Sequence, residues 1–299
     1  MTKISELFSK KGSLLSTEFL PPRAPRLSEL VKKTLEVASV VDSVSLPELK
    51  ANERNGLRKH RMNPFYAALR LRDLTGVETV FHITPRDYNK NAIAGILLAA
   101  AEANLQNILV VSGDRYSAAE EATLSKNVYD FHGTLDIIAA IKSLEKDAGI
   151  VPTGGFCVVV GVDPSVVYTK DEAKIEAEIS KLIERQESGA ELVQTQPVFD
   201  MRFLEFFDAA REHGLRIPVL VGILPLRGRD DSTEIERRYG IRIPNDVKSA
   251  LHDIDEEAGK QAALELASSL VRNGVRGLHV YPREDCDFVL RVARAAFGS

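Results

Sequence analysis

Three consecutive stretches decide the fold: FCVVVGV (156–162), EAKIEAEISKLIERQESGA (172–190) and LVQTQPV (192–198). The first and last are short, apolar and rich in β-branched residues, which is typical of buried strands. The middle stretch repeats its apolar residues at helical spacing, and Gly189 follows where a left-handed residue can end a helix. A strand, a helix and a second strand in this order predict a βα unit of a parallel sheet.

The same alternation extends along the whole chain. The eight short apolar runs are LLSTEFL (14–20), VDSVSL (41–46), ETVFHIT (78–84), NILVVSG (107–113), FCVVVGV (156–162), LVQTQPV (192–198), VLVGIL (219–224) and GLHVY (277–281). Helical patterns lie between them, for example at 28–41, 92–105 and 256–272. Parallel strands are buried on both faces, and closing the sheet removes its edges. The sequence therefore predicts an α/β fold, a closed (β/α)8 TIM barrel.

The chain reads as a single domain over residues 1–299, because no Pro/Ser-rich linker or shift of composition divides it. An insertion around 227–255 separates strands seven and eight. We expect it to cover the active face, although an additional helix pair without such a role is an equal alternative. An open, doubly wound sheet is the alternative fold, but the glycine fingerprint of dinucleotide-binding sheets does not follow the first strand.

Composition excludes several classes of protein. With 44% hydrophobic and 27% charged residues, the 299-residue chain matches ordinary globular proteins, and its net charge of −4 disfavours nucleic acid as a partner. No apolar run is long enough for a signal peptide or a membrane span, so we expect a cytoplasmic protein. Cys157 and Cys286 stand outside any paired motif, so we expect inert thiols. No His, Cys and carboxylate residues stand together at the spacing of metal ligands, so we expect no metal site.

Polar residues stand where the predicted strands end. In a barrel, these positions and the loops after them form the active site. The residues are Glu18, Ser45, Glu48, His82, Thr84, Ser112, Asp114, Asp163, Gln194, Gln196, His279 and Tyr281. The set is rich in carboxylates, contains two amides and has few cations.

Glu18 is the candidate general acid. Its neighbours Phe19, Leu20 and Pro21 are apolar, and apolar surroundings raise the pKa of a carboxyl group. A surface carboxylate paired with Arg23 is the alternative. Asp114 follows Gly113, which allows a ligand to approach the backbone closely, although Gly-Asp is also a common turn pair.

The amide of Gln196 offers a donor and an acceptor that suit the edge of a pterin, although a buried glutamine bridging strands is an ordinary alternative. His82 and His279 are single strand histidines, which are more often core residues than catalysts. Lys181 and Arg185 share one face of the 172–190 helix with Lys174, where they can contact a phosphate or simply face solvent.

Six segments read together, STEFLPPR, FHIT, VVSGD, TQPVFD, VGILP and LHVY, resemble the methylenetetrahydrofolate reductase family. The resemblance covers essentially the whole chain and corresponds to the catalytic barrel without a regulatory extension. It implies an oxidoreductase of one-carbon metabolism and methionine biosynthesis. Such an enzyme reduces 5,10-methylenetetrahydrofolate, or a related methylene-tetrahydropterin, to the 5-methyl form with NAD(P)H and FAD.

The resemblance also implies roles for individual residues. Glu18 delivers the proton that opens the methylene bridge, and Asp114 lies beside the flavin or pterin ring. Gln196, His279 and Tyr281 are expected to bind the pterin. The residues expected around the cofactor are Ser45, His82, Thr84, Ser112, Asp114, Asp163, Lys181 and Arg185.

The chain departs from the family pattern around the flavin. Ser112 stands where members usually carry Arg, 161–163 replaces a Tyr-Pro-Glu element, and Arg229 replaces a Phe. The sequence is therefore compatible with two mechanisms: hydride transfer through FAD, or direct transfer from NAD(P)H. A different class is also open, namely a non-catalytic or accessory pterin-binding barrel in a methyl-transfer complex, with a partner subunit or as a homo-oligomer. No motif selects NADH or NADPH.

Overall fold

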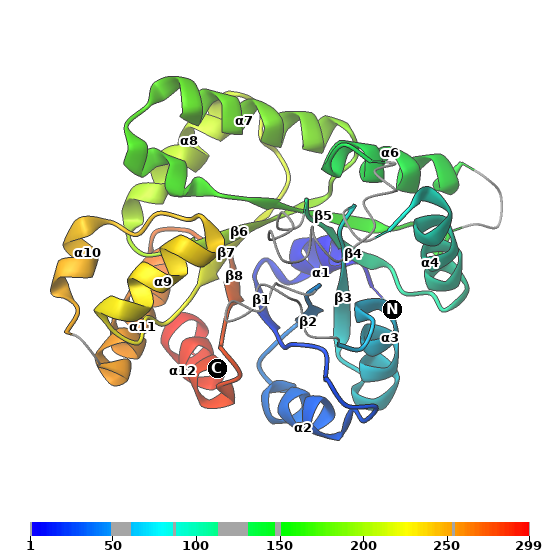
Figure 1. Cartoon of the computed structure of the whole chain (residues 1–299), viewed down its shortest axis with the longest axis horizontal. Coiled ribbons are helices and arrows are strands. Elements are labelled where there is room, and N and C mark those ends of the chain that lie inside the picture. Colours follow the sequence, from blue (N-terminus) through cyan, green and yellow to red (C-terminus); the bar gives the residue numbers. More distant parts are fainter. Residues whose placement is uncertain are drawn as a thin grey trace, which may run out of the picture.

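The computed structural model describes residues 2–48, 61–85, 88–112, 131–146, 151–252 and 255–298. Eight strands form one closed sheet in which each strand pairs in parallel with its neighbours in sequence, and the last strand pairs with the first (Figure 1). The predicted (β/α)8 TIM barrel is confirmed, and the open doubly wound alternative is set aside.

The strands lie within the eight predicted runs. They are β1 (Leu14–Glu18), β2 (Ser43–Leu46), β3 (Glu78–Ile83), β4 (Asn107–Val110), β5 (Cys157–Val162), β6 (Leu192–Val198), β7 (Val219–Ile223) and β8 (Gly277–Val280). Several strands end before the predicted runs do, because the last residues of those runs leave the hydrogen-bonded ladder and turn toward the carboxyl end of the barrel.

Helices surround the barrel. They are α2 (Ser28–Val37), α3 (Pro64–Thr75), α4 (Lys90–Glu102), α6 (Thr134–Glu145), α7 (Glu172–Glu187), α8 (Leu204–Glu212), α11 (Glu256–Arg272) and α12 (Cys286–Phe297), with short 3-10 helices η1 (Pro164–Thr169) and η2 (Met201–Phe203). Helix α7 begins where the Asp171 side chain accepts from the Lys174 backbone N–H. It ends before Gly189, which adopts a φ of 110°, as the sequence predicted.

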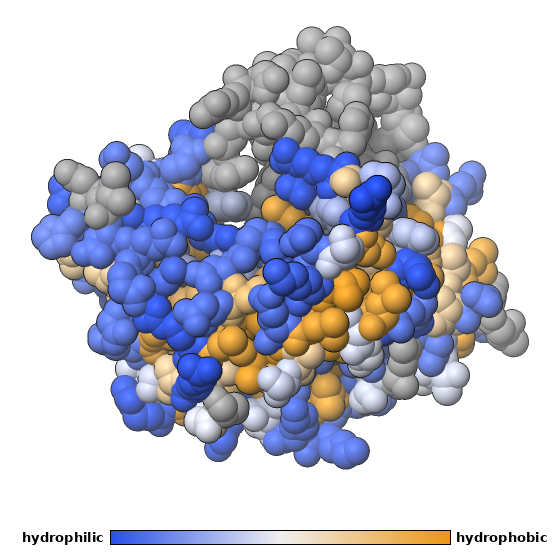
Figure 2. Space-filling view, turned by 90° about the horizontal axis from the view of Figure 1, so that it is seen from below, coloured by the Kyte–Doolittle hydropathy of each residue, from blue (hydrophilic) through white to orange (hydrophobic). Residues whose placement is uncertain are grey.

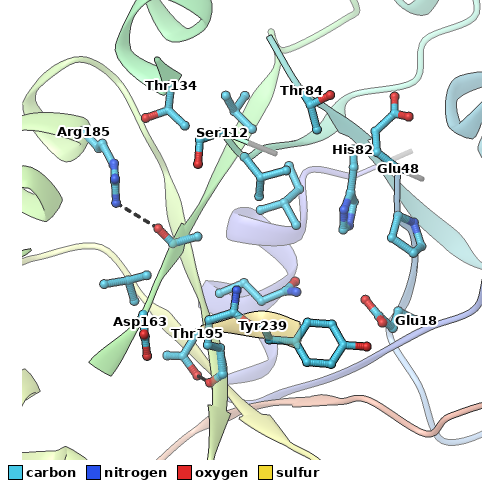
Figure 3. A pocket seen from close by; sticks show the side chains of 18 of the residues that line it. Glu18, Glu48, His82, Thr84, Ser112, Thr134, Asp163, Arg185, Thr195 and Tyr239 are labelled. Atoms are coloured by element: carbon cyan, nitrogen blue, oxygen red, sulfur yellow. Dashed lines mark hydrogen bonds between the residues drawn. The ribbon is translucent and has the colours of Figure 1, made fainter. Parts of the chain in front are cut away.

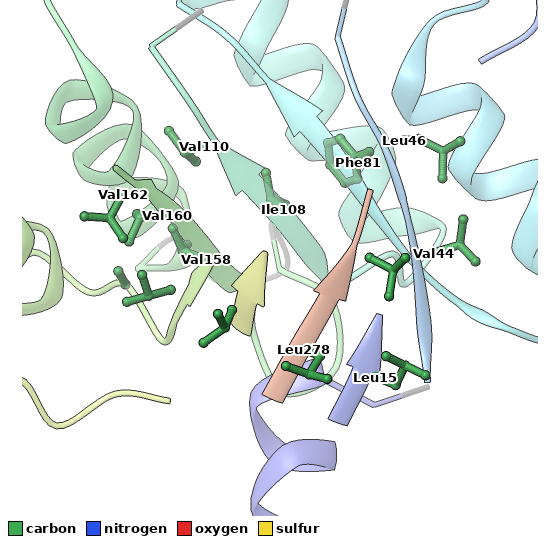
Figure 4. Packing of buried hydrophobic residues seen from close by; sticks show 14 of the residues in the cluster. Leu15, Val44, Leu46, Phe81, Ile108, Val110, Val158, Val160, Val162 and Leu278 are labelled. Atoms are coloured by element: carbon green, nitrogen blue, oxygen red, sulfur yellow. The ribbon is translucent and has the colours of Figure 1, made fainter. Parts of the chain in front are cut away.

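Two apolar layers hold these elements together. The outer faces of the strands pack against the helices through residues such as Val44, Phe81, Ile108 and Val158 (Figure 4). Inside the barrel, a smaller cluster includes Leu109 and its neighbours at the amino end of the strands. Burying each such side chain contributes roughly 1.5–3 kcal/mol.

Helix α1 (Ile4–Lys11) closes the amino end of the barrel. The Ile4 backbone N–H donates to the Asn107 side-chain oxygen over 2.9 Å, and Phe8 packs against the interior cluster. The pattern of the sequence did not indicate this helix. Because α1 covers one end, the opposite end, where the strands terminate, is left for a ligand.

The insertion between β7 and α11 forms two helices, α9 (Arg229–Tyr239) and α10 (Asn245–Ala250). It has an apolar cluster of its own, and the partly buried rings of Tyr239 and Tyr281 pack against that cluster. Gly259 of α11 lies directly against the backbone of Leu226, where a Cβ would approach the carbonyl oxygen to 1.7 Å. The insertion is therefore seated on α11 by a backbone contact that only glycine permits.

Exposed apolar side chains gather on three consecutive helices. Five large apolar side chains are exposed in the described part of the chain, and four of them, Leu35, Tyr66, Leu74 and Leu98, lie on α2, α3 and α4. Figure 2 views the molecule from the side where α2 and α3 lie and shows apolar residues among polar ones. Within the described ranges, no helix has the length and apolarity needed to cross a membrane.

Candidate active site

Two adjoining cavities lie where the strands end. The inner cavity, of about 340 Å³, is lined by residues from β3 to β6 and from α7, and the outer cavity, of about 350 Å³, by residues around β1, β8 and α9. Six residues line both: Glu18, Pro47, Glu48, Gln196, Tyr239 and Tyr281. Each volume falls within the usual range for small-molecule sites. The shared wall is the place where two ligand rings can meet.

Glu18 and Gln196 reach this wall from different strands. Glu18 is the last residue of β1. In β6, the pairing with β7 is irregular between Gln194 and Pro197, because proline has no N–H to donate. Thr195 Oγ1 accepts the Gly222 N–H over 2.8 Å in compensation. Glu18 and Gln196 therefore line the same cavity, while Asp114, which was expected to face it as well, lies outside the described residues.

Tyr281 lies beside Glu18 and is held at its hydroxyl. It donates to the Thr195 carbonyl over 2.8 Å, and Gln194 Nε2 donates to it over 3.4 Å. Burial raises the pKa of Tyr281 well above its ordinary range, and the negative charge of Glu18 raises it further. Tyr281 is thus a neutral phenol at physiological pH. Its side chain lines both cavities.

His279 lies one layer deeper than predicted. The side chain is fully buried, and neither cavity includes it among its lining residues. Its Nε2 lies 3.8 Å from Glu18 Oε2, and its Nδ1 lies 2.7 Å from Ser16 Oγ. In this structure His279 therefore contacts the candidate acid rather than the space for substrate.

Most of the predicted cofactor residues meet in the inner cavity. His82, Thr84, Ser112, Asp163 and Arg185 line it together (Figure 3). The Asp163 side chain accepts from the Ser165 backbone N–H over 2.9 Å and so begins η1. Burial raises the pKa of Asp163 above its ordinary value.

Two predicted cofactor residues do not line the cavity. Ser45 is buried in β2 as the register partner of Glu18. Lys181 points into solvent, with its Nζ 3.6 Å from a Glu178 oxygen. Asp114 lies outside the described residues.

The insertion and α7 supply two lining residues that the sequence reasoning missed. Tyr239, the last residue of α9, presents its ring at the shared wall, and Figure 3 shows the ring directed toward Glu18. Glu178 of α7 lines the inner cavity near Arg185. Neither residue stands at a strand end, so the rule that located the other residues did not reach them.

Negative charge dominates the inner cavity. Four carboxylates line it, from Glu18, Glu48, Asp163 and Glu178. Arg185 is the single Lys or Arg among the described lining residues, and it already donates to the Gly161 carbonyl over 2.9 Å.

Helix α6 does not offer an alternative site for an anion. Its first residue, Thr134, lines the inner cavity, but Asp136 in its first turn already accepts the His132 backbone N–H over 2.6 Å. A diphosphate is bound best by cations and open helix N-termini. The described lining therefore does not fit the diphosphate of FAD.

The outer cavity is more evenly charged. Arg23, Arg61 and Arg283 line it together with several carboxylates. Arg283 forms a two-pronged pair with Asp231 of α9, at 2.6 and 2.8 Å. Arg61 donates to the Pro21 carbonyl over 2.7 Å, and burial together with the charge of Arg23 lowers its pKa. The Arg283–Asp231 pair therefore joins the segment after β8 to the insertion, and the Arg61 contact joins the residues before α3 to the segment after β1.

Comparison with known proteins places the chain in a family. Residues 3–294 match the family described as methylenetetrahydrofolate reductase. The chain is 24% identical over 277 residues to the 5,10-methylenetetrahydrofolate reductase of Pectobacterium carotovorum subsp. carotovorum, covering 89% of this chain and 84% of the relative. It is 26% identical over 291 residues to the probable methylenetetrahydrofolate reductase (NADPH) of Caenorhabditis elegans, covering 93% of this chain but 41% of the relative.

Solved structures support the fold alone. The EDTA monooxygenase EmoA from Chelativorans sp. BNC1 superposes with a TM-score of 0.54 at 12% identity, covering 96% of this chain and 94% of that one. Such low identity carries no information about the reaction. The family match, by contrast, covers every described residue that lines the two cavities. The chain belongs to the methylenetetrahydrofolate reductase family.

Proposed function

We propose that this protein reduces 5,10-methylenetetrahydrofolate, or a closely related methylene-tetrahydropterin, to its 5-methyl form with NAD(P)H. One observation supports this most: Glu18, Gln196, Tyr239 and Tyr281 form a common wall between the two cavities. A carboxylic acid, an amide and aromatic rings are the groups that a bicyclic pterin requires. They provide a proton, a paired donor and acceptor, and a flat face.

The reaction begins with a proton. The Glu18 carboxylic acid protonates N-10 of the folate, so the bond from the methylene carbon to N-10 breaks and an iminium forms at N-5. The reduced nicotinamide supplies a hydride to the methylene carbon, which becomes the methyl group, and the nicotinamide is oxidised. Glu18 then recovers its proton from water.

Gln196 holds the pterin in this scheme. Its amide nitrogen donates to and its amide oxygen accepts from the edge of the pterin ring, which sets the ring plane relative to Glu18. Tyr239 offers a face for stacking. From the family resemblance, we expect Asp114 to approach the same ring.

We propose further that hydride passes directly from NAD(P)H to the iminium in a ternary complex. The four carboxylates of the inner cavity and the engaged Arg185 disfavour a permanently bound dinucleotide. A nicotinamide nucleotide that binds and dissociates in every catalytic cycle needs weaker binding than a permanently bound dinucleotide does. In this proposal, His82, Thr84 and Ser112 line the nicotinamide side of the inner cavity.

Steady-state kinetics and the absorption spectrum of the purified protein test both statements. We expect oxidation of NADH or NADPH that depends on methylenetetrahydrofolate, without added flavin, with intersecting double-reciprocal plots. A flavin spectrum with near-stoichiometric FAD and parallel plots would overturn direct transfer while leaving the reduction itself in place. No turnover with either nucleotide, combined with intact pterin binding, would instead favour the accessory pterin-binding barrel.

A further inference from the structure

We infer that a third cavity, away from the catalytic end of the barrel, binds a small organic carboxylate with an apolar body. This cavity, called the amino-end cavity below, has a volume of about 240 Å³. It lies between Phe8 of α1, Phe207 of α8 and the segments that lead into β7 and β8. It shares no described lining residue with the inner or outer cavity, so the inference goes beyond the proposed function and does not rest on it.

Apolar side chains form one part of the amino-end cavity. Phe203 and Phe207 line it four residues apart, along one side of α8, and Val221 lines it from the outer face of β7. Phe8 of α1 and Leu215 add to this wall. An engineered apolar cavity of about 150 Å³ binds benzene in another protein. The amino-end cavity therefore has room for a ring and a short chain.

Three arginines line the same cavity where it reaches the amino ends of the strands. Arg211 lies in the last turn of α8, Arg216 in the loop before β7, and Arg276 directly before β8. No Asp or Glu stands among the described residues that line the cavity. In a chain with a net charge of −4, this arrangement makes the amino-end cavity a local site of positive charge that attracts an anion.

The three guanidinium groups are available to a ligand. The Arg276 side chain forms no hydrogen bond or ion pair with any other residue in the described ranges. Arg211 pairs with Asp208 at 3.1 Å and Arg216 with Glu187 at 2.6 Å, and all four of these side chains are exposed. Exposed ion pairs contribute little to stability, so a carboxylate in the cavity can share or replace them.

The segments that carry Arg216 and Arg276 are fixed by buried contacts. Gln186 of α7 accepts the Arg216 backbone N–H over 2.7 Å and donates to the Gly214 carbonyl over 3.0 Å. The Arg276 carbonyl accepts the Leu14 N–H over 2.9 Å, which joins it to β1. A site whose backbone is already ordered loses less conformational entropy when it binds a ligand.

The distribution of these groups selects the class of ligand. A guanidinium group binds a carboxylate with two parallel hydrogen bonds, and the ring of the ligand then extends along α8 toward Phe203. A metal cation is repelled by the arginines. Inorganic phosphate leaves the apolar wall uncovered, and a neutral hydrocarbon leaves the arginines without an anion. An aromatic carboxylate satisfies both parts of the cavity.

Isothermal titration calorimetry with 3-phenylpropionate as the probe tests the inference on the full chain. We expect saturable binding of one molecule per chain with a submillimolar dissociation constant. The neutral amide 3-phenylpropanamide, which lacks the charge, and acetate, which lacks the ring, should each bind at least about tenfold more weakly. Saturating NADH and methylenetetrahydrofolate should leave the affinity for the probe unchanged, because they occupy the other end of the barrel.

A pair of arginine variants assigns the binding to this cavity. Arg276→Gln should weaken the probe at least about tenfold, since it removes the unpaired guanidinium group. Arg272→Gln is the matched control, because Arg272 is exposed on α11, donates to Ser268 and Ser269, and does not line the cavity. It should bind the probe as the wild type does. Both arginines are exposed, and melting temperatures verify that each variant is folded.

Several results would overturn the inference. These are equal affinities for the acid and its amide, wild-type affinity in Arg276→Gln, equal losses in both arginine variants, or displacement of the probe by NADH or the folate. Analytical ultracentrifugation adds one more: a dimer that dissociates when the probe is added would show that a second copy of the chain, rather than a small carboxylate, occupies the cavity. None of these results depends on reductase activity, so failure of the proposed function remains a separate outcome.

Discussion

Gly259→Ala tests how the insertion is seated on the barrel. A Cβ at this position would lie 1.7 Å from the Leu226 carbonyl oxygen and 2.8 Å from its carbonyl carbon. Real Cβ atoms essentially never approach a neighbour closer than 3.0 Å, so the oxygen contact is too short by 3.0 minus 1.7, or 1.3 Å. Both neighbouring atoms belong to the backbone and cannot rotate away. Either Leu226 or helix α11 must move.

The magnitude follows from two opposing effects. Overpacking of this kind costs about 1–3 kcal/mol, and a clash with the backbone belongs at the upper end. Alanine gains about 1 kcal/mol over glycine within a helix. The net loss is about 2 kcal/mol, which lowers the melting temperature on the order of 4–8 °C in a domain of this size. Activity should fall as well, because the insertion that begins near Leu226 carries Tyr239 to the site.

Gly95→Ala is the matched control. Gly95 is exposed in α4, and a Cβ there would meet nothing within 4 Å. This variant should therefore gain about 1 kcal/mol from helix propensity alone. Thermal unfolding followed by circular dichroism compares both variants with the wild type. If Gly259→Ala melts at or above the wild-type temperature while Gly95→Ala is stabilised, the described contact between α11 and Leu226 is wrong.

Three further predictions concern titrating groups. Glu18→Gln should abolish folate reduction while pterin affinity changes little, since an amide binds but delivers no proton; turnover near the wild-type rate would remove Glu18 from the mechanism. Because burial raises the pKa of Asp163, the folded protein binds a proton at this carboxyl group more tightly than the unfolded chain does. The resulting contribution to the free energy of unfolding is present below the ordinary pKa of Asp and is lost as the pH rises through the raised value. Asp163→Asn should therefore raise the melting temperature near neutral pH, with a gain that fades on acidification; a gain that grows in acid would contradict this reasoning. Burial raises the pKa of Cys157 to about 11 and that of Cys286 to about 12, so alkylation of the native protein near neutral pH should be about a hundredfold or more slower than that of free cysteine. Rapid labelling of either thiol before unfolding would argue against this.

The strands and the helices that follow them were predictable because their signals are local. Side-chain periodicity and a terminal glycine identify α7, and α11 has the bounds 256–272 that the sequence indicated. Helix α1 was not indicated because it is short and mixed in charge. Its position depends on contacts with Asn107 and the barrel interior, which lie far along the chain.

The candidate site was predictable in part. Parallel strands of a barrel bring their carboxyl ends together, so Glu18 and Gln196 were expected to share a cavity, and they do. The same rule placed His279 on that cavity, whereas the side chain lies below it. Alternation along β8 correctly assigns His279 and Tyr281 to the same face. How deep each lies depends on the stagger between neighbouring strands, which no single strand encodes.

The amino-acid sequence by itself determined the class of fold, the order of strands and helices, and which strand ends bear acids and amides. Each of these depends on residues close together in the chain. Only the tertiary structure decided that Tyr239 reaches the site from the insertion, that Glu178 makes the inner cavity more acidic, and that His279 lies behind Glu18. These relations join residues from different elements, and their distances follow from the closure of the barrel and the packing of helices against it.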